Sequence, residues 1–180
     1  MKKLTIALLT ATVSVTGAFA GTTAKTFKET ITPAPECKFR DQEIQIDAAA
    51  VGAFGNSRPG WGGGLGVNYF FTKYIGIGVE QDIVGREAFG GSSGGAKWIT
   101  AGNFLLRYPI CSWNLAPYAM VGGGAAYASE QAGYGFGHVG GGLEYRFTNN
   151  IGVFSDARYV YSSEDPKNAL LGRAGLRFAF

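Results

Sequence analysis

The final stretch of the chain, RAGLRFAF at positions 173–180, changes character from one residue to the next. One parity holds Ala174, Leu176, Phe178 and Phe180, and the other includes Arg173, Gly175 and Arg177. Alternation with a period of two predicts a β-strand that has one apolar and one polar face. Because an unpaired strand edge is a template for pairing with other chains, we expect this last strand to be paired on both sides.

The first residues have the features of a secretory signal peptide. Lys2 and Lys3 precede the apolar run at 4–9, and AFA at 18–20 is a small-residue cleavage site. An uncleaved anchor is the alternative, but threonines and a serine interrupt the apolar segment. We therefore expect a signal peptide at 1–20, a periplasmic lead-in at 21–42 and one domain at 43–180. No later window holds the ~18 consecutive apolar residues of a spanning helix, so a membrane-embedded domain would be a barrel.

Glycine is the most prominent feature of the composition, with 29 of 180 residues. The glycines lie within hydrophobic alternation, which favours ordered strands over low-complexity disorder. The formal net charge is +3, from 16 basic and 13 acidic residues, and two of the basic residues lie in the expected signal peptide. Without a basic cluster, the sequence predicts no nucleic-acid partner.

Period-two alternation recurs from Glu43 onward, and no 3.6-residue apolar stripe competes with it. It predicts eight strands, at 43–54, 62–71, 74–84, 97–108, 116–127, 134–147, 151–161 and 168–180. Polar or glycine-rich loops at 55–61, 85–96, 128–133 and 162–167 alternate with shorter connections. Long loops on one side, short turns on the other and an even strand count predict an all-β fold. We expect a closed eight-stranded antiparallel up-and-down barrel.

The residues of the polar parity indicate which face is inside. They are mainly glycine, alanine, arginine and carboxylates, whereas the outer face of a soluble barrel would be rich in lysine, glutamate and threonine. Compact residues and ion pairs suit the narrow interior of eight strands, so we expect the apolar parity to face lipid in a transmembrane barrel. Two aromatic sets fit two membrane interfaces: Tyr69, Phe71, Tyr108, Tyr145, Phe147, Phe178 and Phe180, and Phe54, Trp98, Tyr127, Tyr159 and Tyr161. A secreted ligand-binding barrel is the alternative.

The last strand also carries a resemblance to a known family. Arg173, Gly175, Phe178 and Phe180 match the pattern polar–x–Gly–x–x–aromatic–x–aromatic. With hairpin segments such as GGGLGVNYFF, this resembles the small outer-membrane β-barrels of the OmpA/OmpX and opacity-protein type, a porin family, over about 43–180. The resemblance implies a bacterial outer-membrane protein that contacts outer-membrane lipids and lipopolysaccharide, and whose last strand is read by the barrel-assembly machinery. It implies a non-enzymatic structural or surface-interaction role, with no extracellular partner identified. We expect no peptidoglycan-binding domain after the barrel, so cell-wall anchoring is not carried over from the family.

The expected lumen holds a network of balanced charge. Five acids lie on its parity with five arginines: Asp47, Glu80, Asp82, Glu144 and Asp156, with Arg107, Arg146, Arg158, Arg173 and Arg177. Because buried charges are tolerated when they are paired, a filled and mostly closed interior is the favoured interpretation. A narrow porin gated by these ion pairs is the alternative. We expect the network to centre on the last three strands.

Enzymatic chemistry has little support in the sequence. His138 is the single histidine, and Gly140 stands where the serine of an outer-membrane lipid A deacylase would be. The three Gly-Gly-Gly runs are not followed by the helix that a phosphate-binding loop requires. We expect no catalytic residues, cofactor or metal, and rank a lipid-modifying enzyme below the other functions.

Two cysteines raise the question of a disulfide. Cys37 precedes the first strand and Cys111 lies between the fourth and fifth, so the expected topology puts both on the periplasmic side. The periplasm is oxidising, which favours a bond between them that ties the lead-in to the barrel. Two free thiols are the alternative.

Overall fold

The computed structural model describes residues 36–55, 59–85, 95–128, 131–162 and 168–180. The expected signal peptide and most of the expected lead-in lie outside the described residues, as do parts of all four expected loops.

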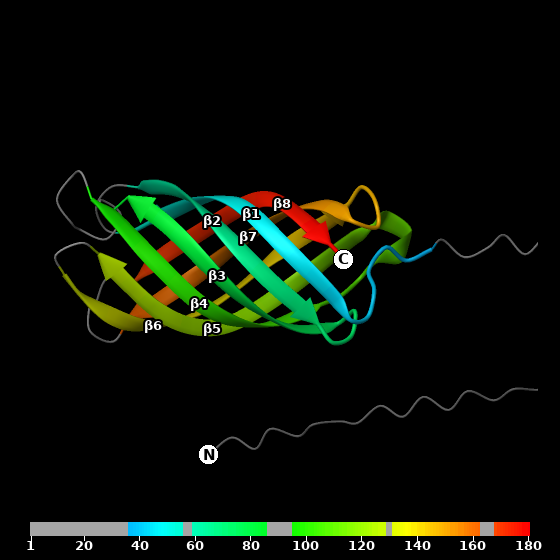
Figure 1. Ribbon diagram of the computed structural model, residues 1–180, viewed down its shortest axis with the longest axis horizontal. Helices are drawn as coiled ribbons and strands as arrows, with labels where there is room; N and C mark the ends of the chain where they lie inside the picture. Colours follow the sequence, from blue (N-terminus) through cyan, green and yellow to red (C-terminus); the bar gives the residue numbers. More distant parts are fainter. Residues whose placement is uncertain (1–35, 56–58, 86–94, 129–130, 163–167) are drawn as a thin grey trace, which may run out of the picture. The chain divides into compact units, whose positions relative to one another are not determined.

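Eight antiparallel strands close into a barrel in sequence order (Figure 1). They are β1 (Glu43–Phe54), β2 (Gly60–Phe70), β3 (Ile75–Gly85), β4 (Ala96–Arg107), β5 (Leu115–Ala128), β6 (Gln131–Arg146), β7 (Ile151–Ser162) and β8 (Ala169–Ala179). The predicted fold class is therefore confirmed. Among the described residues, no helix is long and apolar enough to cross a membrane.

The strands extend into all four predicted loops. Gly60 and Trp61 belong to β2, and β6 begins at Gln131, where Ala128 pairs with it across the hairpin. The expected loop at 128–133 is therefore wrong for most of its length. The ladder continues there because backbone hydrogen bonds hold a hairpin without apolar side chains, and the polar sequence SEQAG gave no sign of that pairing.

The end of the chain closes the barrel. β1 and β8 pair from Gln45 with Ala179 to Phe54 with Leu170. Beyond this ladder, the amide of Phe180 donates to the carbonyl of Ile44 at 2.9 Å, and the carbonyl of Phe180 accepts from the amide of Ile44 at 3.2 Å. β8 also pairs with β7, so the last strand has a partner on each side, as its alternation predicts.

The short connections lie at one end of the barrel, here called the turn end, formed by residues 71–74, 108–114 and 147–150. Two of them use the same arrangement: the hydroxyl oxygens of Thr72 and Thr148 each accept hydrogen bonds from two backbone amides, those of the last turn residue and the first residue of the next strand. The third contains a 3₁₀ helix, η2 (Cys111–Trp113), which ends at Asn114 in the left-handed conformation, φ 54°. The other end, called the loop end, is where β1, β3, β5 and β7 end and β2, β4, β6 and β8 begin (Figure 1).

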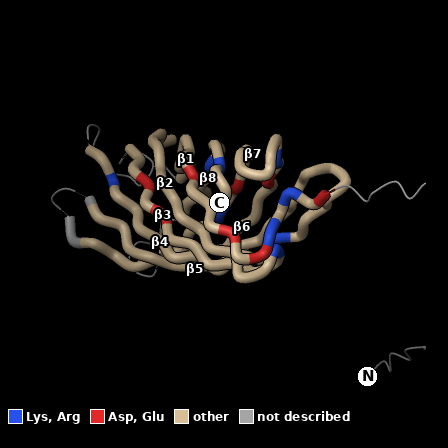
Figure 2. Tube along the Cα trace, turned by 45° about the vertical axis from the view of Figure 1, so that its right-hand side comes forward, with Lys and Arg blue, Asp and Glu red and all other residues tan. Residues whose placement is uncertain are grey.

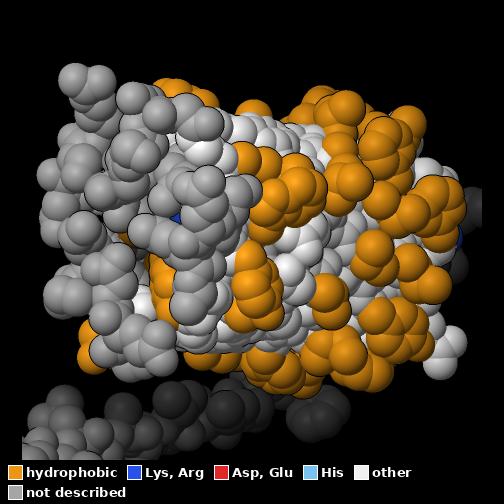
Figure 3. Space-filling model, turned by 60° about the vertical axis from the view of Figure 1, so that its left-hand side comes forward, with side chains coloured by type: hydrophobic (Ala, Val, Ile, Leu, Met, Phe, Trp, Pro, Cys, Tyr) orange, Lys and Arg blue, Asp and Glu red, His pale blue; other side chains and the backbone are white. Residues whose placement is uncertain are grey.

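The outer wall is apolar. Alternate residues of the strands expose valine, leucine, isoleucine and aromatic side chains, and Figure 3 shows hydrophobic side chains spread over one face. Rings are exposed near both ends: Phe71, Tyr74, Tyr108, Trp113, Tyr145, Phe147 and Phe180 near the turn end, and Phe54, Trp61, Trp98, Tyr127, Tyr159 and Tyr161 near the loop end. Tyr69 and Phe178 are only half-exposed. An apolar wall between two aromatic belts fits a bilayer, so the barrel is of the transmembrane type.

Candidate functional site in the barrel lumen

All ten charged residues that the alternation places inside the barrel are buried there, with 0 to 6% of each exposed. They come from six of the eight strands, β1, β3, β4, β6, β7 and β8, so the network is wider than the last three strands on which we expected it to centre. Figure 2 shows most charged positions towards the turn end. The ten residues form two networks, which differ in their balance of charge.

The base network lies nearest the turn end. Arg146 Nη2 is 2.7 Å from Glu43 Oε1, and its Nε bonds to Glu144. Arg107 Nη1 lies 3.0 Å from Glu43 Oε1 and 3.5 Å from Glu144 Oε2. Arg177 completes the network, with 2.8 Å from Nη1 to Glu144 Oε2 and 2.6 Å from Nη2 to Asp47 Oδ2. Three arginines thus meet three carboxylates.

Glu43 is the member of this network that the sequence analysis missed. It is the first residue of β1, two positions before Gln45 and four before Asp47, and so shares their inward parity. Its side chain is fully buried, and Gln45 Nε2 also donates to its Oε1 at 2.6 Å. Applying the inward parity of Gln45 and Asp47 to the first residue of the predicted strand at 43–54 would have found it.

The middle network lies farther from the turn end. Glu80 bonds to both Arg158 and Arg173, and Arg158 Nε donates to Asp156 Oδ1 at 3.0 Å. Asp82 completes it, at 3.8 Å from Arg173 Nε. Three carboxylates share two arginines here, and neither oxygen of Asp82 has a hydrogen-bond partner among the described residues.

Aromatic rings fill the space around the arginines. Phe70 lies under Arg107, with 3.8 Å from guanidinium carbon to ring centre, and Phe154 lies under Arg177 at 4.5 Å. Tyr118 connects the two networks: its ring lies 5.5 Å from Arg177, and its hydroxyl donates to Asp156 Oδ2 at 2.9 Å. Cations over ring faces lose less on leaving water. The charged part of the lumen is therefore packed with side chains.

Towards the loop end the lumen becomes mainly apolar, although the buried Lys97 also lies there. An apolar plug, defined as Val51, Ala53, Val84, Ile99, Ala126 and Leu171, forms one buried cluster, with Tyr134, Phe136 and Val160 packed against it. The expectation of a charged or glycine-lined lumen is wrong for this half, because inward parity does not by itself require a polar side chain. A cavity of about 20 Å³ remains between the plug and the middle network, lined by Glu80, Arg158 and His138 among others.

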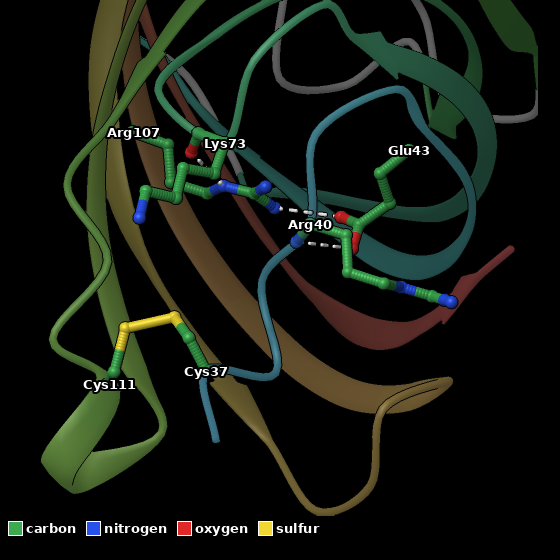
Figure 4. Close-up of a disulfide and its surroundings, with 6 residues drawn as sticks. All are labelled: Cys37, Arg40, Glu43, Lys73, Arg107 and Cys111. Atoms are coloured by element: carbon green, nitrogen blue, oxygen red, sulfur yellow. Dashed lines mark hydrogen bonds and ion pairs between the residues drawn. A yellow bond between two sulfur atoms is a disulfide. The ribbon is translucent and has the colours of Figure 1, made fainter. Parts of the chain in front are cut away.

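The described part of the lead-in covers the turn end. Cys37 and Cys111 form the disulfide expected from the sequence, with Cα atoms 4.8 Å apart (Figure 4). Two residues on, Phe39 is 2% exposed, and its ring centre lies 5.0 Å from the Arg107 guanidinium and 5.3 Å from that of Arg146. Lys38 Nζ donates to the carbonyl of Phe147 at 2.8 Å. The segment thus lies across the base network.

His138 has no catalytic surroundings among the described residues. It is buried in the lumen, where Nε2 lies 2.6 Å from Asn103 Oδ1 and its ring lies near Phe136. Within the described ranges, no group of three or more histidines, cysteines or carboxylates could hold a metal ion.

Comparison with known proteins bears on the fold. Neisserial surface protein A aligns with 77% of this chain and 96% of its own, with a TM-score of 0.62 and 17% identity. The N-terminal β-barrel domain of OprF from Pseudomonas aeruginosa aligns with 78% of this chain and 99% of its own, with a TM-score of 0.58 and 18% identity. Ail, the attachment invasion locus protein of Yersinia pestis, aligns with 78% of this chain and 99% of its own, with a TM-score of 0.55 and 16% identity. No protein-family model and no curated protein matches the chain. The resemblance seen in the sequence is thus confirmed for the fold, which is that of the small eight-stranded outer-membrane β-barrels.

Proposed function

We propose that this chain is an integral protein of the bacterial outer membrane, with a non-enzymatic structural or surface-interaction role and a lumen that does not conduct. The observation that carries the proposal is the contrast between the apolar wall and the buried, ion-paired interior. The fold it shares with solved outer-membrane barrels supports the same location. Outer-membrane lipids and lipopolysaccharide are the expected surroundings.

Cell fractionation tests the location. The protein should appear in the outer-membrane fraction and, on an SDS gel, migrate differently before and after boiling, because a closed strand network resists SDS until heated. N-terminal sequencing of the same band tests cleavage after Ala20. A soluble periplasmic protein without a heat-dependent shift would contradict the proposal and favour a ligand-binding barrel.

A narrow porin is the second candidate function. The observation in its favour is that side chains rather than backbone close the lumen, and that the middle network has an excess carboxylate next to a small cavity. Recordings in planar bilayers distinguish the two candidates. The closed barrel predicts no steady openings, whereas openings whose conductance changes in Glu80→Gln would establish the porin.

A surface-interaction role has one further support, since Ail is named an attachment protein and shares this fold. One structure of Ail holds the heparin analogue sucrose octasulfate. The expected loops of this chain lie largely outside the described residues. Binding of cells expressing the protein to immobilised heparin, compared with cells lacking it, tests whether a sulfated polysaccharide is a partner.

The last strand is proposed to be the signal for the barrel-assembly machinery, through Arg173, Gly175, Phe178 and Phe180. Two of these residues also serve the folded barrel: Arg173 pairs with Glu80, and a Cβ at Gly175 would clash with the carbonyl of Ala48. The ring of Phe180 is largely exposed, so among these four residues its side chain should contribute least to the stability of the folded barrel. Phe180→Ala should therefore lower the amount inserted in cells without lowering the stability of refolded protein. Equal insertion would contradict the signal.

A further inference from the structure

A polar pair interrupts the apolar outer wall. Gln81 lies on the outward face of β3, next to its central residue, and Thr100 lies directly opposite on β4. The Thr100 hydroxyl donates to Gln81 Oε1 at 2.6 Å, and Gln81 Nε2 donates to the carbonyl of Ile99 at 3.3 Å. The outward residues on either side along β3, Val79 and Ile83, are exposed and apolar.

This pair leaves hydrogen-bonding capacity unused. A primary amide has two N–H donors and an oxygen with two lone pairs. Each hydrogen bond above uses one of these, so one donor and one lone pair of Gln81 have no partner in the described part of the chain. At mid-strand, the wall faces acyl chains, which offer neither a donor nor an acceptor. A polar group in that position is costly unless another protein group meets it.

The residues around the pair are small enough for another protein to come close to it. Gly63, Gly102, Gly123 and Ala125 lie on the outward parity of neighbouring strands, and an open groove of about 840 Å³ runs past Gln81 between Trp61 and Trp98. Packing in the barrel does not require glycine at position 102, where a Cβ would meet nothing nearer than the carbonyl oxygen of Gly123 at 4.0 Å. Small residues on a lipid-facing surface let a second backbone come close.

We propose that a second copy of this chain binds this face, in a symmetric dimer in which the two Gln81 amides pair. An amide that keeps one donor and one lone pair free can both donate to and accept from a second such amide, so two copies related by a twofold axis can exchange N–H···O bonds. Both copies enter the membrane in the same orientation, so the axis lies along the membrane normal and Gln81 meets Gln81 at one depth. A lipid chain fills the groove but leaves both amides unpaired.

Energy transfer between donor- and acceptor-labelled copies in phosphatidylcholine vesicles tests the dimer. Labels are attached to the N-terminal amine, and transfer is followed as lipid is added. The wild type should keep transfer above the level of random proximity. Gln81→Leu should weaken association roughly five- to tenfold, because membrane-buried hydrogen bonds are individually modest. Gly102→Phe should weaken it by steric exclusion while leaving the hydrogen bonds of Gln81 intact.

Matched controls separate this proposal from that of the outer-membrane barrel. Val139→Phe adds a ring to β6 on a different part of the wall and should associate like the wild type. The heat-dependent gel shift shows that each variant is folded, independently of dimerisation. Transfer at the random level in the wild type, or equal association of wild type and Gln81→Leu, would overturn the proposal. A second result would also overturn it. If brominated acyl chains quench Trp61 and Trp98 equally at low and high protein density, then lipid rather than a second copy occupies the groove.

Discussion

The two halves of the lumen are filled in different ways by the same eight strands. Towards the turn end, arginines and carboxylates form networks in which nearly every charged side chain is ion-paired. Towards the loop end, the apolar plug fills the same cross-section with valine, alanine, isoleucine and leucine. Ion pairs require particular partners at particular distances, whereas apolar packing requires mainly volume. The charged half should therefore respond to single substitutions more sharply than the plug.

The largest effect is expected at Arg177, which holds two carboxylates at once. Arg177→Met keeps a long side chain but leaves Asp47 and Glu144 each short of a partner. Removing one member of a buried ion pair costs about 3–5 kcal/mol, because the remaining charge stays buried. Urea unfolding in lipid vesicles, followed by tryptophan fluorescence, measures the loss. Adding Asp47→Asn to the variant should restore part of the stability, and a loss below about 1 kcal/mol would show that water reaches these carboxylates.

The next largest effect is expected at the disulfide. In the described part of the chain, it ties the lead-in to the charged half of the barrel and not to the plug. The bond closes a separation of 74 residues, and losing such a cross-link typically costs about 2–4 kcal/mol. The double variant Cys37→Ser and Cys111→Ser should also free Phe39 from the base network. The temperature of the gel shift, compared with wild type treated with dithiothreitol, measures the change. Unchanged shift temperature in both samples would mean that the segment 36–42 adds no stability.

A smaller effect is expected in the plug. Ile99→Val removes one methylene group from a buried cluster, which costs about 0.5–1.5 kcal/mol. The same urea experiment applies, with Val139→Ala on the outer wall as the matched control for loss of apolar volume outside the lumen. A loss as large as that of Arg177→Met would remove the distinction between the two halves.

How far the sequence predicts this molecule also differs between its regions. Strand parity is local information, and it correctly placed Asp47, Glu80 and Arg177 inside the barrel, together with the other seven predicted charges. Which charged residues pair with one another depends on how neighbouring strands are staggered, and the sequence of a single strand does not contain that information. The sequence therefore could not show that Arg177 joins β1 to β6, or that Val51 and Val84 meet in a plug.

The lead-in was less predictable still. Phe39 lies in a segment without periodicity, and its burial depends on two arginines from distant strands and on the disulfide. The cysteines gave the one usable signal, since the topology put both at the same end. Glu43 could have been assigned to the lumen by parity, since the predicted strand and β1 both begin there.

The smallest effect is expected at Asp82, although it is a fully buried charge. It lies where the charged half meets the plug, two residues before Val84, and its network has three carboxylates for two arginines. Neither of its oxygens is hydrogen-bonded among the described residues, so the ordinary penalty for removing a buried charge does not apply. Asp82→Asn should change the free energy of unfolding by less than about 1 kcal/mol, because the amide is easier to bury than the carboxylate. Asp47→Asn, which removes the negative charge and one of the two oxygens that accept from Arg177, is the matched control and should cost clearly more. Equal losses in the two variants would mean that Asp82 is paired as firmly as Asp47, and that charge balance rather than individual contacts sets the stability of the lumen.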